Sequence, residues 1–180
     1  MPARNDQLEG GGRMIHVYTG KGKGKTTAAL GLAVRAAGSG LKVYIGQFIK
    51  GRRYGELNAL KKFKNIKIEQ FGRRCFIKKA PDEEDIRLAR EGFQKVKKII
   101  AKRIFDVVIL DEINVALHLK LISVKEMLSL IRNSPRKREL VLTGRYAPNE
   151  ILKKADLVSD IREIRHYYRK GVIARRGIEF

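Results

Sequence analysis

The stretch that decides the fold is Thr19-Gly20-Lys21-Gly22-Lys23-Gly24-Lys25-Thr26-Thr27. It follows an apolar run at 15–18 that is typical of a buried strand, and it opens an alanine-rich segment at 26–37 that is typical of a helix. A glycine-rich loop between a strand and a helix is the setting of a phosphate-binding P-loop. Glycines let backbone N–H groups turn toward phosphate oxygens, and the helix N-terminus adds positive partial charge. The sequence therefore predicts a nucleotide-binding loop over residues 19–27.

Side chains of this loop have distinct predicted tasks. Lys25 is expected to reach the outer phosphates, and to face solvent when no nucleotide is bound, while Thr26 offers a hydroxyl to Mg²⁺. The loop departs from the usual pattern at one position, because Thr19 stands where a glycine is usual. The alternative is a glycine-rich turn in a basic protein. It leaves the ordered succession of strand, glycines, Gly-Lys-Thr and helix unexplained.

An acidic pair at the end of a second apolar run supplies the other half of such a site. The run at 106–110 is apolar on both faces, which predicts a central strand, and Asp111 and Glu112 follow it directly. A carboxylate at this place lies beside a P-loop and holds Mg²⁺ directly or through water. The alternative is an acid that caps a helix after a buried strand.

Apolar runs that alternate with helical patterns predict the rest of the architecture. We expect strands at 15–18, 41–48, 66–71, 106–110 and 139–142, and helices at 26–37, 55–63, 82–103, 124–131 and 149–154. The tail from 157 to 180 is expected to form a strand and a hairpin. The fold class is α/β: a single domain at 14–180 with a doubly wound, mainly parallel sheet of the RecA-like P-loop NTPase type. A flexible segment at 1–13 precedes it.

The charge balance is strongly basic, with 40 Lys and Arg against 19 Asp and Glu and a net charge of +21. Such an excess attracts nucleic acid, anionic lipid or small polyanionic substrates, although solubility or heat tolerance would also account for it. The sequence contains no apolar stretch long enough to span a membrane, no signal peptide and only one cysteine, Cys75. These features predict a cytoplasmic protein.

Further segments of the sequence indicate which class of P-loop protein this is. They are Gln47-Phe48-Ile49-Lys50-Gly51 with Gly55-Glu56, Leu110-Asp111-Glu112, Leu142-Thr143-Gly144-Arg145-Tyr146-Ala147-Pro148, Ala155-Asp156-Leu157-Val158-Ser159, and the ending Arg165-His166 … Gly171-Val172 … Arg176-Gly177-Ile178-Glu179-Phe180. Together with the phosphate loop, whose leading Thr19 matches that family's own variant, they resemble the P-loop ATP:corrinoid adenosyltransferases over about residues 14–180.

The resemblance implies a reaction and roles for residues. Members transfer the 5′-deoxyadenosyl group of ATP to Co(I) of a reduced corrinoid and release triphosphate. By position, the loop from Thr19 to Thr27 binds ATP, with Lys21, Lys23 and Lys25 on the triphosphate. Thr26 and Glu112 hold Mg²⁺, with Asp111 as an outer or water-mediated ligand. Arg145 is expected to close on the substrate, with an ordinary surface arginine as the alternative.

The family also has an aromatic loop that meets the corrinoid, and residues 71–77 correspond to it. This chain contains no tryptophan, so the usual aromatic pair is absent and Phe76 is the candidate for its role, with a core phenylalanine as the alternative. The resemblance further implies a homodimer and a reduced flavoprotein as electron donor. A rival reading is a P-loop ATPase acting on nucleic acid, but the basic stretches are not interleaved with the aromatic residues that stack on bases.

Overall fold

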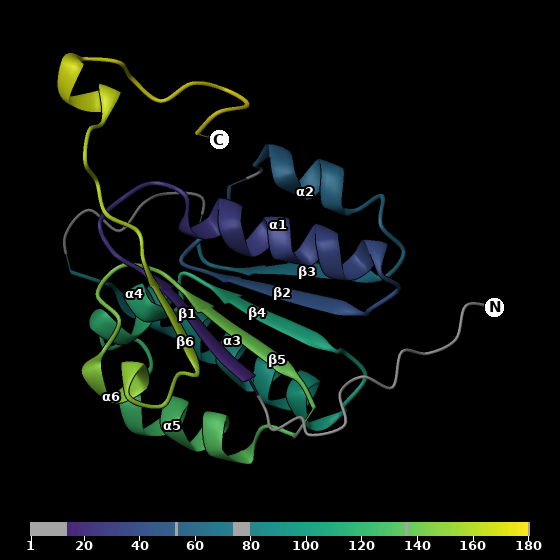
Figure 1. Cartoon of the computed structure of the whole chain (residues 1–180). Helices are drawn as coiled ribbons and strands as arrows, with labels where there is room; N and C mark the ends of the chain where they lie inside the picture. The colour runs from purple at the N-terminus through teal and green to yellow at the C-terminus, as the bar shows by residue number, and fades with distance from the viewer. Residues whose placement is uncertain (1–13, 53, 74–79, 136, 180) are drawn as a thin grey trace.

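The fold is built on one sheet of six parallel strands, seen in a computed structural model (Figure 1). The structure describes residues 14–52, 54–73, 80–135 and 137–179. Along the sheet the strands follow the order β3-β2-β4-β5-β1-β6. They are β1 (Met14–Thr19), β2 (Val43–Phe48), β3 (Ile66–Phe71), β4 (Val107–Asp111), β5 (Glu139–Thr143) and β6 (Leu157–Asp160). The predicted α/β class is confirmed, and the sheet is parallel throughout.

Helices cover both faces of this sheet. On one face lie α1 (Lys25–Gly38) and α2 (Gly55–Leu60), and on the other lie α3 (Glu83–Ala101), α4 (Ile113–His118), α5 (Val124–Asn133) and α6 (Asn149–Leu152) (Figure 1). Each side has its own apolar cluster against the sheet. Every residue of β2 and β4 is buried, which explains their continuous apolar runs. None of the described helices has the length and apolar character that crossing a membrane requires.

Local sequence signals explain the clearest helix. Asp82 precedes α3 and accepts a hydrogen bond from the Asp85 N–H, while the Asp85 side chain accepts one from the Asp82 N–H. This capping box satisfies N–H groups that the first turn of a helix leaves unpaired. Acidic residues follow in the first turn and Lys98 lies in the last, as the helix dipole favours. The helix spans 83–101, close to the predicted 82–103.

One expectation needs correction, and one helix was missed. The tail was expected to form a strand and a hairpin; it forms β6, which pairs in parallel with β1, and then a 3₁₀ turn at Tyr167–Lys170. Helix α4 was not predicted at all. It begins directly after β4 because Glu112 adopts a left-handed conformation with φ +58° that turns the chain in one residue. No glycine or proline marks this turn in the sequence.

Parallel strands place all their carboxyl ends at one edge of the sheet, which is where α/β proteins bind ligands. That edge brings together the phosphate loop after β1, the acidic pair after β4 and the Thr-Gly-Arg turn after β5. The segments that follow β2 and β6 join them there. The fold thus gathers most of the predicted site residues from distant parts of the chain.

Candidate functional site

The phosphate loop (residues 19–27) connects β1 to α1, as predicted. Gly20 and Gly24 have φ values of +99° and +122°, in a region that only glycine enters without strain. Lys25 does not face solvent, contrary to expectation. It is 7% exposed, and its Nζ donates to the Gly22 carbonyl at 2.5 Å. Burial, with the positive Arg145 nearby, lowers the pKa of Lys25, so the ammonium turns inward to the carbonyl that compensates it.

The loop rests tightly on the chain that leaves β6. The Gly22 N–H donates to the Ile161 carbonyl at 2.7 Å. A Cβ on Gly22 would lie 2.8 Å from backbone atoms of Arg162, and one on Gly20 would collide with Asp160 and Ile161. The absence of a side chain at these two glycines therefore allows the backbone after β6 to approach the loop closely, in addition to allowing the loop to turn.

Lys23 is held by the tail (residues 161–179). Its Nζ lies 2.8 Å from Glu179 Oε1, 3.0 Å from the Ile178 carbonyl and 3.1 Å from the Tyr167 hydroxyl. These bonds raise the pKa of Lys23, chiefly through Glu179. The structure thus places Lys23 against the tail, whereas Lys21 is exposed in a cavity beside the loop.

Asp111 is the centre of the site and is completely buried. Its Oδ1 accepts hydrogen bonds from Thr26 at 2.9 Å and Thr143 at 2.6 Å. Its Oδ2 accepts from Gln47 at 3.2 Å and from Lys50 at 2.7 Å. Burial alone would raise the pKa of Asp111, but the ion pair with Lys50 and the hydroxyl bonds outweigh it and hold the pKa below its usual value. Asp111 therefore stays ionised and joins the phosphate loop to strands β2 and β5.

Lys50 is a site residue that no role was predicted for. Its Nζ also lies 3.2 Å from Thr26 Oγ1, so one ammonium bridges the loop hydroxyl and the buried carboxylate. Burial works against its charge, yet Asp111 raises the pKa of Lys50 above its usual value. The sequence could have indicated this role, because Lys50 belongs to a segment that carries the family resemblance and directly follows β2. Residues that follow parallel strands lie at the carboxyl edge of the sheet, where ligands bind.

Glu112 follows Asp111 at the end of β4 and is partly buried. Its backbone N–H donates to the Thr143 hydroxyl at 3.1 Å. Its carboxyl group lies against Gly144, where an added Cβ would be 3.3 Å from Glu112 Oε2. Burial raises the pKa of Glu112, and the negative charge of Asp111 raises it further. The positive charges of Lys50, Lys25 and Arg145 oppose this rise in pKa.

The oxygen donors at this edge fit Mg²⁺. Thr26 Oγ1 and the Asp111 carboxylate are 2.9 Å apart, and the Lys50 ammonium contacts both. Among the described residues, no three His, Cys, Asp or Glu side chains gather to hold a metal alone. Mg²⁺ is commonly bound by one or two protein ligands together with phosphate oxygens and water.

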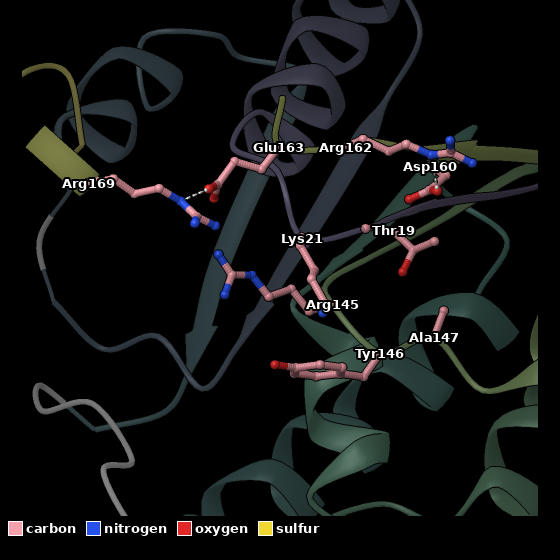
Figure 2. A pocket seen from close by; sticks show the side chains of 10 residues that line it. Thr19, Lys21, Arg145, Tyr146, Ala147, Asp160, Arg162, Glu163 and Arg169 are labelled. Atoms are coloured by element: carbon pink, nitrogen blue, oxygen red, sulfur yellow. Dashed lines mark hydrogen bonds and ion pairs between the residues drawn. The ribbon is translucent and has the colours of Figure 1, made fainter. Parts of the chain in front are cut away.

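A cavity of about 680 Å³ opens beside the phosphate loop (Figure 2). Its lining comes from the loop, from the turn after β5 and from the chain around and after β6, and consists of Thr19, Gly20, Lys21, Arg145, Tyr146, Ala147, Asp160, Arg162, Glu163 and Arg169. Arg145, predicted to close on the substrate, does line this cavity. Phe76, predicted to meet the corrinoid, lies outside the described residues.

A phosphate loop joined through Thr26 to a buried aspartate on β4 defines a P-loop nucleotide-binding protein. The model of the family ATP:corrinoid adenosyltransferase BtuR/CobO/CobP matches residues 12–180. The chain belongs to this family, and the resemblance inferred from its motifs is confirmed.

Similarity to individual corrinoid adenosyltransferases supports the same family membership. The chain is 35% identical over 179 residues to the corrinoid adenosyltransferase of Escherichia coli K12, covering 99% of this chain and 91% of that protein. It is 34% identical over 168 residues to the corrinoid adenosyltransferase CobA of Salmonella typhimurium, covering 93% and 85%. It is 31% identical over 169 residues to the corrinoid adenosyltransferase of Pseudomonas aeruginosa, covering 93% and 83%.

Proposed function

We propose that this protein transfers the 5′-deoxyadenosyl group of ATP to the Co(I) centre of a reduced corrinoid and releases triphosphate. The observation that carries the proposal is the junction of loop and acidic pair, where Thr26, Asp111 and Lys50 meet within 3.2 Å of one another. It lies in a chain that belongs to the adenosyltransferase family over nearly its whole length.

The chemistry asks the protein to position two substrates rather than to activate water. The lone pair of Co(I) forms a bond to C5′ of ATP, and the bond between C5′ and the triphosphate oxygen breaks. The electron pair leaves with the triphosphate. The protein stabilises the charge that grows on this leaving group through loop N–H groups and cations that are already in place. Lys25 and Lys21 supply that charge from the loop, and Arg145 supplies it from the turn after β5.

Thr26, Glu112 and Asp111 are the residues that would hold Mg²⁺. When bound, this ion neutralises charge on the triphosphate. Asp111 already accepts four hydrogen bonds from protein groups, so its role is to orient Thr26 and to attract the cation. Glu112, which accepts none among the described residues, has its oxygens free for a ligand or its water.

The partners follow from the same proposal. A corrinoid precursor that keeps several carboxylates suits a chain of net charge +21 better than a complete cobalamin does. We also propose a reduced flavoprotein as the electron donor and a homodimer as the working state, both because the family resemblance implies them. The rival reading, an ATPase acting on nucleic acid, is not favoured by membership of this family.

The products of the reaction test the proposal. With ATP, Mg²⁺ and chemically reduced corrinoid, phosphorus NMR is expected to show intact triphosphate, because attack at C5′ expels all three phosphates together. The visible spectrum should report adenosylated corrinoid in equal amount. Release of ADP and phosphate, independent of corrinoid, would instead identify a hydrolytic ATPase.

Removing either proposed metal donor should weaken the binding of Mg²⁺, so that ATP binding requires a higher Mg²⁺ concentration. Glu112→Gln and Thr26→Ala are each expected to raise the Mg²⁺ concentration for half-maximal ATP binding about tenfold, because a hard cation loses a charged or hydroxyl oxygen. Titration of Mg²⁺ at fixed ATP measures this. Glu150→Gln, at an exposed position of helix α6, is the matched control. Wild-type titration curves in both site variants would show that the metal is held elsewhere.

A further inference from the structure

Tyr146 has a backbone conformation that its side chain does not favour. It follows the Thr-Gly-Arg turn with φ +62°, in the left-handed region that bulky residues rarely enter. Such conformations persist where the surrounding structure holds them, and they cluster at binding sites. In this chain the result is that an aromatic ring is turned into the cavity beside the phosphate loop.

The ring is supported from behind yet open to solvent. It stacks on His118 of α4, with ring centroids 4.4 Å apart and planes inclined by 29°. Tyr146 is nevertheless 51% exposed, so a large part of the ring remains available. An aromatic ring that is fixed by stacking and exposed in a cavity is a surface on which a flat ligand group can stack.

Charges in the cavity indicate where phosphates would lie relative to that ring. Arg162 pairs with Asp160 at 3.1 Å, and Arg169 pairs with Glu163 at 2.6 Å. Over the described ranges, Lys21 and Arg145 have no such partner, and both line the same cavity. Figure 2 shows Arg145 and Tyr146 extending in the same direction from neighbouring positions of the turn. Two unpaired cations beside a phosphate loop, with an aromatic ring next to them, match a phosphate chain joined to a base.

We propose that Tyr146, backed by His118, is the platform on which the purine base of ATP stacks. The proposal rests on the proposed function only in taking ATP as the nucleotide. Stacking uses the π-face of the base, so the ring rather than the hydroxyl of Tyr146 provides the contact. The unpaired Lys21 and Arg145 orient the phosphates that connect this base to the loop. Tyr146 is therefore a positioning residue, which places the adenosine relative to the corrinoid.

The test compares a nucleotide with its phosphate chain alone. Calorimetry measures ATP and inorganic triphosphate binding, without corrinoid, to the wild type, Tyr146→Gly and Tyr146→Phe. Tyr146→Gly should bind ATP about tenfold more weakly, because base–aromatic stacking is lost, but should bind triphosphate as the wild type does. Tyr146→Phe should stay within twofold for both ligands. His118→Ala should give a smaller loss, confined to ATP.

A structural role is separated from binding by thermal stability. Glycine accepts the left-handed conformation without strain, so Tyr146→Gly should not lower the melting temperature even as ATP affinity falls. The control is Tyr168→Gly, which removes a tyrosine that is also exposed, 71% against 51% for Tyr146, and that does not line the cavity. It should leave ATP affinity unchanged.

Three outcomes would overturn the proposal. Unchanged ATP affinity in Tyr146→Gly would show that the base lies elsewhere. An equal loss for ATP and triphosphate would show that the ring acts only through the loop. A loss of corrinoid affinity with ATP affinity intact, seen in a separate corrinoid titration of the same variants, would assign the ring to the other substrate. Since all these measurements concern binding, failure of the adenosyl transfer itself appears separately in the product analysis.

Discussion

Lys25→Ala is expected to abolish measurable ATP binding while the protein stays folded. The ammonium of Lys25 is the buried positive charge of the phosphate loop, and its bonds to phosphate oxygens are charge-assisted. Losing them should lower ATP affinity by roughly 100-fold or more. Stability should not fall, because burial already disfavours this charge and its one hydrogen bond in the described structure is to the Gly22 carbonyl. Calorimetry and circular dichroism measure the two effects.

Lys23→Ala is the matched control for this experiment. Lys23 belongs to the same loop and carries the same charge, but its ammonium is engaged by Glu179, Tyr167 and the Ile178 carbonyl. Its loss should reduce ATP affinity much less than the loss of Lys25. Wild-type affinity in a folded Lys25→Ala protein would contradict the assignment of the loop, and equal losses in both variants would contradict the separation of their roles.

Gly20→Ala is expected to damage the fold and the site together. Gly20 has φ +99°, and an added Cβ would collide with Asp160 and with the backbone of Ile161. Strained conformation and overpacking each cost about 1–3 kcal/mol, so the free energy of unfolding should fall by about 3 kcal/mol. ATP binding should be lost because the loop must move away from β6. Urea unfolding and calorimetry provide the measurements.

Gly31→Ala is the control that shows whether the loss of stability and ATP binding is specific to position 20 or follows from any glycine-to-alanine substitution. Gly31 lies within α1, the helix that the loop opens, and a Cβ there meets no atom within 4 Å. The change should leave ATP binding intact and raise stability by up to about 1 kcal/mol, since alanine is the better helix residue. If Gly20→Ala were as stable as the wild type, the tight contact between loop and β6 would not exist in solution.

The sequence was most informative where the site is made from one continuous segment. The phosphate loop could be placed within a residue or two because strand, glycines, lysine and helix follow one another directly. Asp111 and Glu112 could be placed because a run that is apolar on both faces predicts a central strand. The family resemblance then added the identity of the substrates, which no local pattern contains.

What escaped prediction depends on contacts across the sheet. Lys50 reaches Asp111 only because β2 and β4 are neighbours, a fact that the order of strands along the chain does not reveal. The inward orientation of Lys25 and the contacts of Lys23 with the tail also depend on the folded conformation, which the sequence pattern does not specify. In the tail, the expected strand is present as β6, which pairs in parallel with β1. The expected hairpin is not found in the described part of the tail, where a 3₁₀ turn at Tyr167–Lys170 ends at the left-handed Gly171.

The edge of the sheet at the amino ends of the strands lies opposite the candidate functional site. The turns that feed the strands at their amino ends are closed by their own bonds, as where Asn65 donates to the carbonyls of Ala37 and Leu41. A strand of six residues keeps these turns roughly 20 Å from the phosphate loop. Gly40 is exposed there, with no atom within 4 Å of an added Cβ. This is the side by which the enzyme can be tethered to a support with its substrates still free to enter.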